Sequence, residues 1–347
     1  MEESGAYAPA LRSLEICAGA GGQALGLERA GFELEAAVEL DAAACATLRL
    51  NRPSWDVRQV DVHDFSGRAF DGIDLLAGGV PCPPFSIAGK QLGSDDERDL
   101  FPEMLRLVAE ANPRAVMIEN VRGLLSKRFT PYRATIIAEL ESLGYVGEWR
   151  LFHASDFGVP QLRPRSILVA MRREHWQHFV WPVSALPTPT VGSAIGDLMA
   201  SRKWPGAAAW KKRAAGIAPT LVGGSKKHGG PDLGPTRARQ QWANLGVDGK
   251  GLADEAPGKD FPKDAMPRLT IPMVARVQGF PDDWSFFGRK TAQYRQVGNA
   301  FPPPVAAAIA TEVANALHAD PTQSGARTVQ VRLMETSLSF GANARAL

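Results

Sequence analysis

Residues 14–22 read LEICAGAGG, and this stretch decides the fold of the chain. Its apolar start predicts a buried strand, its glycines predict a tight turn, and residues 23–30 predict a helix that ends at Gly31. The glycines let the backbone approach a ligand, and the first turn of the helix offers free N–H groups. A strand, a glycine turn and a helix in this order are typical of a cofactor site in an α/β protein.

Acidic residues follow the next two predicted strands. Residues 34–38 predict a strand that ends in Glu39, about 20 residues after the glycine turn, where a carboxylate can accept both hydroxyls of a ribose. Residues 57–62 predict a third strand ending in Asp61, whose carboxylate could accept a hydrogen bond from an adenine amino group. The alternative is a solvated acid in a loop. The pattern indicates a nucleoside-bearing cofactor, and a dinucleotide would fit the glycine spacing as well.

Length and composition bound the kind of protein. The 347 residues suffice for an α/β core plus a smaller second domain. The net charge is only +2, so a nucleic-acid partner would need a local basic surface. The three cysteines form no C-x-x-C pair, which suits a reducing, cytoplasmic location. Neither a signal peptide, nor a membrane-spanning apolar run, nor a metal-spaced His/Cys cluster is recognisable, so we expect no membrane partner and no metal.

A cysteine held between prolines is the second notable feature. Residues 79–86 read GVPCPPFS and follow the predicted strand 73–77. The prolines hold Cys82 on a rigid turn at the carboxyl end of this strand, where open α/β sheets bind their ligands. The alternative is a small buried hydrophobe, the usual role of a free cysteine. Residues 88–99 are polar and contain glycine, a composition that predicts a lid.

A carboxylate is predicted at the same edge of the sheet. Residues 115–118 predict a buried strand with Glu119 at its carboxyl end. Beside the cysteine turn, Glu119 makes a candidate acid–nucleophile pair, whereas the alternative is an acid that caps the next helix. Arg163 and Arg165 alternate along an extended segment, so both should point the same way, where they could clamp an anionic or carbonyl-bearing substrate. The alternative is a solvated charged edge.

The composition changes at residues 181–182. From there to about residue 267 the chain is rich in Gly, Pro, Lys and Arg, and its periodicity is weak. Between residues 201 and 240, nine Lys and Arg are opposed by Asp232 alone, with Trp, His and Gln interleaved. Such a surface suits a phosphate backbone, although a solvated basic loop has the same composition. The α/β pattern returns after residue 269 and ends in an Ala-rich helix near residue 317.

With these motifs in this order, the chain resembles the bacterial DNA cytosine-5 methyltransferases from residue 14 to about residue 317. The motifs that carry the resemblance are 17–22, Glu39, Asp61, 81–82, 119–121, Gln161-x-Arg163-x-Arg165, 220–221, 276–281 and 296–300. The resemblance implies an α/β fold with a Rossmann-like methyltransferase domain and a mainly parallel sheet. It places this domain at 1–181 and 269–318, a smaller irregular target-recognition domain at 182–268, and a tail at 319–347.

The resemblance also assigns site residues. Cys82 would be the nucleophile and Glu119 would protonate or hydrogen-bond ring nitrogen 3, while Arg163 would hold the cytosine carbonyl and Arg165 would support Glu119. The implied cofactor is S-adenosyl-L-methionine, with contacts from Cys17, Ala18, Gly19, Gly21, Gly22, Glu39, Leu40, Asp61, Val62, Leu100, Asn299 and Ala300. The implied DNA contacts are Ser86, Arg98, Thr220, Leu221, Lys226, Lys227, Arg237 and Arg239.

Three departures from the family pattern are visible. Cys17 and Leu40 stand where many members carry an aromatic residue, and Pro83 replaces the glutamine that usually follows the nucleophile. We therefore hypothesise that cofactor affinity rests more on aliphatic contacts here. Pro83 lies outside the set of residues that make bonds, so activity is still expected.

The resemblance implies transfer of a methyl group to carbon 5 of a cytosine that has been flipped out of a specific duplex DNA sequence. The expected partners are double-stranded DNA and a cognate restriction endonuclease that acts separately. A monomer is expected, because one flipped base needs one site. The alternatives are a transfer-RNA cytosine-5 methyltransferase on the same scaffold, a non-catalytic DNA-binding paralogue and a nicotinamide oxidoreductase. Retention of the catalytic residues argues against the paralogue, and hydride transfer has no use for a Pro-Cys motif.

Overall fold

The computed structural model describes residues 10–81, 99–183, 186–224, 230 and 232–320. Its main element is a seven-stranded sheet with the strand order β3-β2-β1-β4-β5-β8-β6. The strands β1 to β5 pair in parallel, and β8 runs antiparallel to both β5 and β6. The mainly parallel sheet is therefore confirmed. The strands are β1 (Leu11–Ile16), β2 (Phe32–Glu39), β3 (Val57–Gln59), β4 (Leu75–Gly78), β5 (Ala115–Val121), β6 (Tyr145–His153) and β8 (Pro164–Arg172).

Helices pack on both faces of this sheet because its central strands are apolar on both sides. Leu75 and Met117 belong to a cluster with α1 (Gly22–Arg29) and α11 (Pro303–His318). Their neighbours Leu76 and Val116 belong to a second cluster with α3 (Phe101–Ala111) and α4 (Thr130–Ser142). Successive side chains of a strand point to opposite faces, so the continuous apolar runs of β4 and β5 bury both faces.

Short elements complete the sheet domain. The helix α2 (Ala42–Asn51) begins after Asp41, whose side chain accepts hydrogen bonds from Ala43 N and Ala44 N. The helix α5 (Arg173–Trp176) follows β8. Five 3₁₀ turns span Val62–Asp64, Arg68–Phe70, Arg122–Leu125, Lys127–Phe129 and Ala154–Phe157. No helix in the described ranges is long and apolar enough to cross a membrane.

Two strand ends differ from the predictions. β3 ends at Gln59, because its partner strand β2 ends at Glu39, which pairs with Gln59. Asp61 lies beyond this ladder and caps the following 3₁₀ turn by accepting a hydrogen bond from His63 N. β5 continues through Glu119 to Val121, because β8 pairs with it along this whole length.

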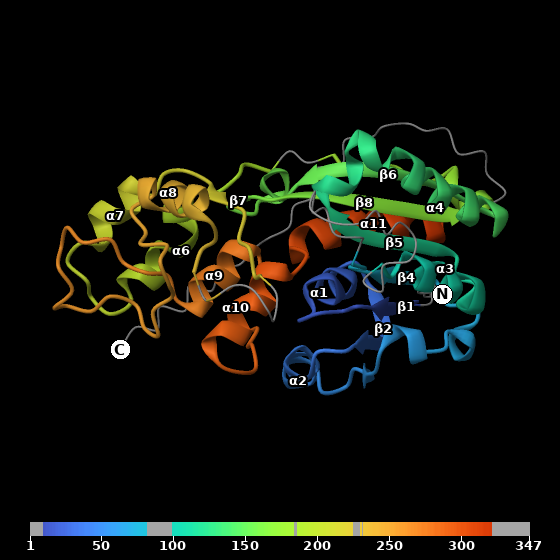
Figure 1. Ribbon diagram of the computed structural model, residues 1–347, viewed down its shortest axis with the longest axis horizontal. Coiled ribbons are helices and arrows are strands. Elements are labelled where there is room, and N and C mark those ends of the chain that lie inside the picture. The colour runs from blue at the N-terminus through green and yellow to red at the C-terminus, as the bar shows by residue number, and fades with distance from the viewer. Residues whose placement is uncertain (1–9, 82–98, 184–185, 225–229, 231, 321–347) are drawn as a thin grey trace, which may run out of the picture.

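A second group of elements lies away from the sheet, at the left of Figure 1. It contains α6 (Val191–Ala200), α7 (Ala207–Arg213), α8 (Thr236–Asn244) and β9 (Ala218–Pro219), which pairs in parallel with β7 (Gln161–Leu162). Between this group and the sheet lie α9 (Ile271–Gln278) and α10 (Lys290–Asn299) (Figure 1).

One apolar cluster runs through all of these parts. It joins Leu25 of α1 and Val277 of α9 to Trp210 of α7 and Trp242 of α8. α9 and α10 therefore share their core with this second group of elements. The predicted boundaries at residues 181–182 and 268–269 remain a prediction, and so does the tail from residue 319.

Candidate active site

A cavity of about 240 Å³ lies at the carboxyl edge of the sheet. Its walls come from the turn after β1, the end of β2, the start of α2 and the last turn of α10. Eight of the predicted site residues line it: Cys17, Ala18, Gly19, Gly22, Glu39, Glu119, Asn299 and Ala300. The structure thus brings residues predicted to bind the cofactor and the predicted catalytic acid to one cavity.

The glycine turn is shaped for close approach between backbones. Gly21 has a φ of 85°, a conformation that favours glycine, and it leads directly into α1. A Cβ atom on Gly22 would lie 2.2 Å from the carbonyl oxygen of Phe301. Only glycine therefore allows Phe301, which also lines the cavity, to approach the backbone at this point.

Glu39 connects two walls of the cavity. One carboxylate oxygen accepts a hydrogen bond from Gly19 N at 2.7 Å, and the other accepts one from Asp41 N at 2.7 Å. The carboxylate therefore holds the glycine turn against the end of β2. Nearby, burial raises the pKa of the Cys17 thiol, and the negative charge of Glu39 adds to this effect. Cys17 is thus a neutral thiol rather than a nucleophile.

Glu15 is a cavity residue that sequence reasoning missed. It lies on β1, only 1% of it is exposed, and its Oε2 atom has no hydrogen-bond partner among the residues that the structure describes. Burial, followed by the charge of Glu39, raises the pKa of Glu15 well above its usual value. The signal was present in the sequence, because an acidic residue inside an apolar strand is costly unless it has a partner.

Other cavity residues were also missed. They are Ala20, Gln23, Asp41, Ala44, Gly79, Arg295, Gln296 and Phe301. Arg295 forms an ion pair with Asp41 at 3.6 Å, and among the described residues that line the cavity it is the only basic one. Asp41 and Gln23 were available from the sequence, since both lie within two residues of a predicted site residue.

Glu119 and Arg165 form an almost buried ion pair. Arg165 Nε lies 2.5 Å from Glu119 Oε1, and their side chains are 11% and 12% exposed. Burial lowers the pKa of Arg165, whereas the neighbouring carboxylate acts in the opposite direction. The other carboxylate oxygen, Oε2, lies against Gly79, where an added Cβ would be 3.3 Å away. This agrees with the predicted support of Glu119 by Arg165.

The end of β5 is also fixed to the strand that leads to Cys82. Asn120 Nδ2 donates a hydrogen bond to Val80 O at 2.8 Å, and Leu100 N donates one to Pro81 O at 3.2 Å. Cys82 itself lies outside the described residues, and so does the predicted lid except for Asp99, which is buried. The acid–nucleophile pair therefore stays a prediction, but Glu119 lies beside Gly79, three residues before Cys82 in the sequence.

The position of Arg163 differs from the predicted contact with a cytosine carbonyl. Its guanidinium is 1% exposed and donates to the carbonyl oxygens of Leu221 at 2.7 Å and of Gly298 and Ala300 at 2.9 Å each. It does not line the cavity. The physical reason is that carbonyls at the end of a helix lack partners within that helix, and Arg163 satisfies those at the end of α10.

Several predicted cofactor contacts lie outside the cavity lining. A Cβ on Gly21 would meet Leu48 and Trp284, so this glycine serves packing. Leu40 is 62% exposed, Val62 is buried in the core, and Leu100 precedes α3. Asp61 accepts a hydrogen bond from His63 N at 3.0 Å and pairs with the His63 ring at 2.7 Å.

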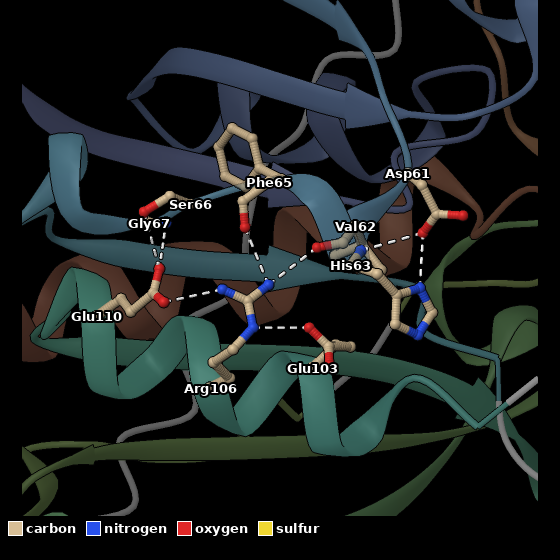
Figure 2. Close-up of polar contacts among 9 residues, drawn as sticks. All are labelled: Asp61, Val62, His63, Phe65, Ser66, Gly67, Glu103, Arg106 and Glu110. Atoms are coloured by element: carbon tan, nitrogen blue, oxygen red, sulfur yellow. Dashed lines mark hydrogen bonds and ion pairs between the residues drawn. The ribbon is translucent and has the colours of Figure 1, made fainter. Parts of the chain in front are cut away.

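The loop that carries Asp61 is anchored to α3 by Arg106 (Figure 2). Arg106 donates to the carbonyl oxygens of Val62 and Phe65 at 2.9 Å each. Its remaining nitrogens contact the carboxylates of Glu103 at 2.7 Å and Glu110 at 2.9 Å. The position of the Asp61 loop therefore depends on one guanidinium of α3.

The predicted DNA contacts are only partly described. Ser86, Arg98, Lys226 and Lys227 lie outside the described residues. Leu221 is buried, so its side chain does not provide the predicted DNA contact, because it packs in the apolar cluster that contains Trp210 and Trp242. Thr220 donates its hydroxyl to Leu162 O. On α8, Arg237 is exposed and Arg239 is half-buried. No group of three metal-ligating side chains occurs in the part of the chain described.

Comparison with known proteins agrees with this geometry. The sequence model of the family described as "C-5 cytosine-specific DNA methylase" matches residues 11–315. The chain belongs to this family. It is a DNA cytosine-5 methyltransferase, and the resemblance noted in the sequence is confirmed. The interpretation as a nicotinamide oxidoreductase is therefore wrong.

Two relatives are more than half identical. The chain is 57% identical over 312 residues to the Type II methyltransferase M.NaeI of Lentzea aerocolonigenes, covering 89% of this chain and 76% of the relative. It is 55% identical over 309 residues to the Type II methyltransferase M.NgoMIV of Neisseria gonorrhoeae, covering 88% and 97%.

Solved structures support the same fold. A putative DNA modification methyltransferase from an E. coli prophage superposes with a TM-score of 0.63 at 23% identity, covering 89% of this chain and 99% of that one. A mutant of Spodoptera frugiperda DNMT2 superposes with a TM-score of 0.61 at 19% identity, covering 88% and 99%. At these identities the likeness concerns the fold alone.

Proposed function

We propose that this DNA methyltransferase uses S-adenosyl-L-methionine to methylate carbon 5 of a cytosine flipped out of a specific duplex sequence. The observation that carries the proposal is the shared cavity, which Glu119 lines together with the glycine turn and Glu39. A group transfer needs both reactants in near-attack contact, and one cavity provides this for the cofactor and the base.

The charges of the cavity fit this cofactor. Its lining carries the carboxyl groups of Glu15, Glu39, Asp41 and Glu119 and one guanidinium, that of Arg295. When bound, S-adenosylmethionine supplies an electrophilic methyl group on a positively charged sulfur. An ammonium group would give the orphaned Oε2 of Glu15 a partner. Glu39 would bind the ribose hydroxyls, because each of its oxygens keeps a lone pair beyond its backbone hydrogen bond.

The chain's own residues would activate the base. The Cys82 thiolate adds to carbon 6 of the ring, and the electron pair of the 5,6 double bond becomes available at carbon 5. Glu119 holds ring nitrogen 3 through a proton, with Arg165 on its other oxygen. After carbon 5 has gained the methyl group, loss of its proton to a base or water expels Cys82 and restores the ring.

The recognition region would bind the duplex. Residues 182–268 carry thirteen Lys and Arg against seven Asp and Glu, whereas the whole chain has a net charge of only +2. A local excess of cations suits the phosphate backbone. The relatives named Type II methyltransferases support a role in a bacterial restriction-modification system. In that role the enzyme would act as a cytoplasmic monomer, separately from its cognate endonuclease.

The test is incubation with radiolabelled S-adenosylmethionine and unmethylated genomic DNA, followed by bisulfite sequencing. We expect one short motif to be protected. Label in transfer RNA but not in DNA would assign the enzyme to RNA. Cofactor binding without incorporation into either would identify a non-catalytic paralogue. A duplex with 5-fluorocytosine at the target should trap the Cys82 adduct, because carbon 5 then has no proton to lose, and mass spectrometry would detect the added mass.

A further inference from the structure

The helix α8 of the recognition region has one face that the protein's own core does not use. Its exposed side chains include Arg237, Gln240, Gln241 and Asn244. These positions are three or four residues apart, so they form one stripe along the helix. Trp242, the only fully buried residue of α8, lies on the opposite side.

The side chains of this stripe make few hydrogen bonds to the rest of the described protein. Arg237 and Gln241 make no side-chain hydrogen bond within the described residues. Gln240 and Asn244 contact each other only at 3.5 Å. The stripe has no acidic residue and no lysine. Arginine pairs in bidentate fashion with guanine, and glutamine or asparagine with adenine, in the major groove.

The helix is held rigidly, as a reading element requires. Trp242 is completely buried, and its carbonyl oxygen accepts hydrogen bonds from Leu245 N and Val247 N at 3.0 Å each. Arg213, at the end of α7, donates to Ala243 O at 2.9 Å. The side chains of the stripe are therefore presented from a fixed backbone, so that little further entropy is lost when they bind.

A short path of contacts connects α8 to the active site. α8 packs against β9, which pairs with β7. Leu221, just after β9, accepts a hydrogen bond from Arg163, and Arg165 pairs with the catalytic acid Glu119. These contacts connect α8 to the strand that supports Glu119, so we expect a duplex that delivers its cytosine to Glu119 to lie close to α8.

The charges near α8 favour nucleic acid as its occupant. α7 ends in three consecutive exposed cations, Lys211, Lys212 and Arg213, and its last turn meets the end of α8 through the Arg213–Ala243 contact. Lysines suit phosphates as point charges, whereas the side chains of the α8 stripe suit base edges. This difference suits α7 for binding the phosphates of a duplex and α8 for contacting its base edges.

We propose that α8 lies in the major groove of the target duplex and that Arg237 and Gln241, with Gln240 and Asn244, read the bases beside the flipped cytosine. This inference rests on the proposed function and names the part of the molecule that sets its sequence specificity.

The test uses the full-length enzyme and duplexes in which each base pair of the methylated motif is replaced in turn. For Arg237→Lys and Gln241→Ala we expect the preference for the correct base to fall about tenfold to 100-fold at one or two positions. Arg237→Lys keeps the charge and removes the bidentate fork. If both variants keep the wild-type preference at every position, the proposal is overturned.

Lys212→Ala is the matched control. It removes a phosphate-binding charge, so we expect every sequence to be affected alike and the salt dependence of binding to fall by about one counterion. A changed base preference in this variant, with none in the α8 variants, would assign reading to α7 instead. A variant that is too slow to assay is compared through its binding to the same duplexes. If the wild type methylates no DNA, the proposed function fails, and this outcome is distinct from failure of the α8 assignment.

Discussion

The guanidinium of Arg165 lies 2.5 Å from Oε1 of Glu119, and both groups are almost fully removed from water. Such a pair costs desolvation energy that its attraction offsets only while both partners are present. It also leaves Oε2, which lies beside Gly79, as the carboxyl oxygen that a base can meet.

Replacing Glu119 by glutamine should therefore reduce turnover at least about 100-fold, because an amide cannot pass a proton to ring nitrogen 3. It should also lower the free energy of unfolding by about 3 kcal/mol, since Arg165 would stay buried without its counter-charge. Methyl incorporation and thermal unfolding measure the two effects. Glu139→Gln, on the exposed face of α4, is the control. Normal turnover by Glu119→Gln would remove Glu119 from the mechanism.

Arg163→Gln should weaken DNA binding and stability together. The substitution removes the donor to the carbonyls of Leu221 and Gly298 in a buried place, whereas Ala300 O keeps its hydrogen bond from Gln278, and we expect a loss of about 3 kcal/mol of unfolding free energy. The KM for DNA should rise, because Leu221 belongs to the recognition region. Arg173→Gln, at an exposed position, should change neither quantity. If only kcat falls, Arg163 acts on the base, as the sequence resemblance implied.

Arg106→Met should weaken cofactor binding indirectly, by releasing the loop that carries Asp61, the predicted adenine contact. The variant keeps much of the side chain's apolar stem but loses the contacts to Val62 O and Phe65 O that hold the Asp61 loop. Calorimetry should show an affinity for S-adenosylmethionine about tenfold lower. Arg68→Met alters an exposed arginine between the same loop and β4, and should leave the affinity unchanged. Equal affinities in both variants would disprove the anchoring role.

The His63–Asp61 pair should respond to pH. The hydrogen bond to Asp61 raises the pKa of His63, and the contacts with His63 lower the pKa of Asp61. Because the folded-state pKa of His63 is raised, its stabilisation is fully present below its ordinary pKa and is lost as pH rises through the raised value. NMR titration should show the raised pKa, and Asp61→Asn should return it to its usual value. An unchanged titration in Asp61→Asn would contradict the pairing.

Two cysteine variants separate the roles of the thiols. Cys82→Ser should abolish turnover while cofactor binding persists, because a hydroxyl is a far weaker nucleophile than a thiolate. Cys17→Ser should retain most methyl transfer, because burial keeps Cys17 a neutral thiol. The trapped 5-fluorocytosine adduct should therefore form in Cys17→Ser and be absent in Cys82→Ser. Robust methylation by Cys82→Ser would refute the nucleophile assignment.

Local sequence patterns were enough to predict the frame of the site. The strand–glycine–helix unit is encoded within residues 14–30, and the turn after β1 lines the cavity with Glu39, as the spacing indicated. Such features follow from propensities and periodicities that act over a few residues. The antiparallel placement of β8 between β5 and β6 depends on tertiary pairing instead, and it was not foreseen.

The features that could not be predicted depend on contacts between residues far apart in the sequence. The partners of Arg163 lie 58, 135 and 137 positions away, and no spacing rule connects them. Glu15 was overlooked because a strand residue is normally assigned to packing. The end of β3 was misplaced because the ladder stops where its partner strand β2 ends, at the Glu39–Gln59 pair.

The apolar cluster that joins α1, α9 and α10 to Trp210 and Trp242 has a consequence for engineering new specificities. If residues 182–268 were exchanged for those of a relative, the new side chains would pack against α1, α9 and α10 residues of a different protein, and their volumes would not match. Surface substitutions on α8 leave this packing unchanged. Changing the target sequence by point mutation of one helix should therefore preserve folding far better than transplanting the whole region.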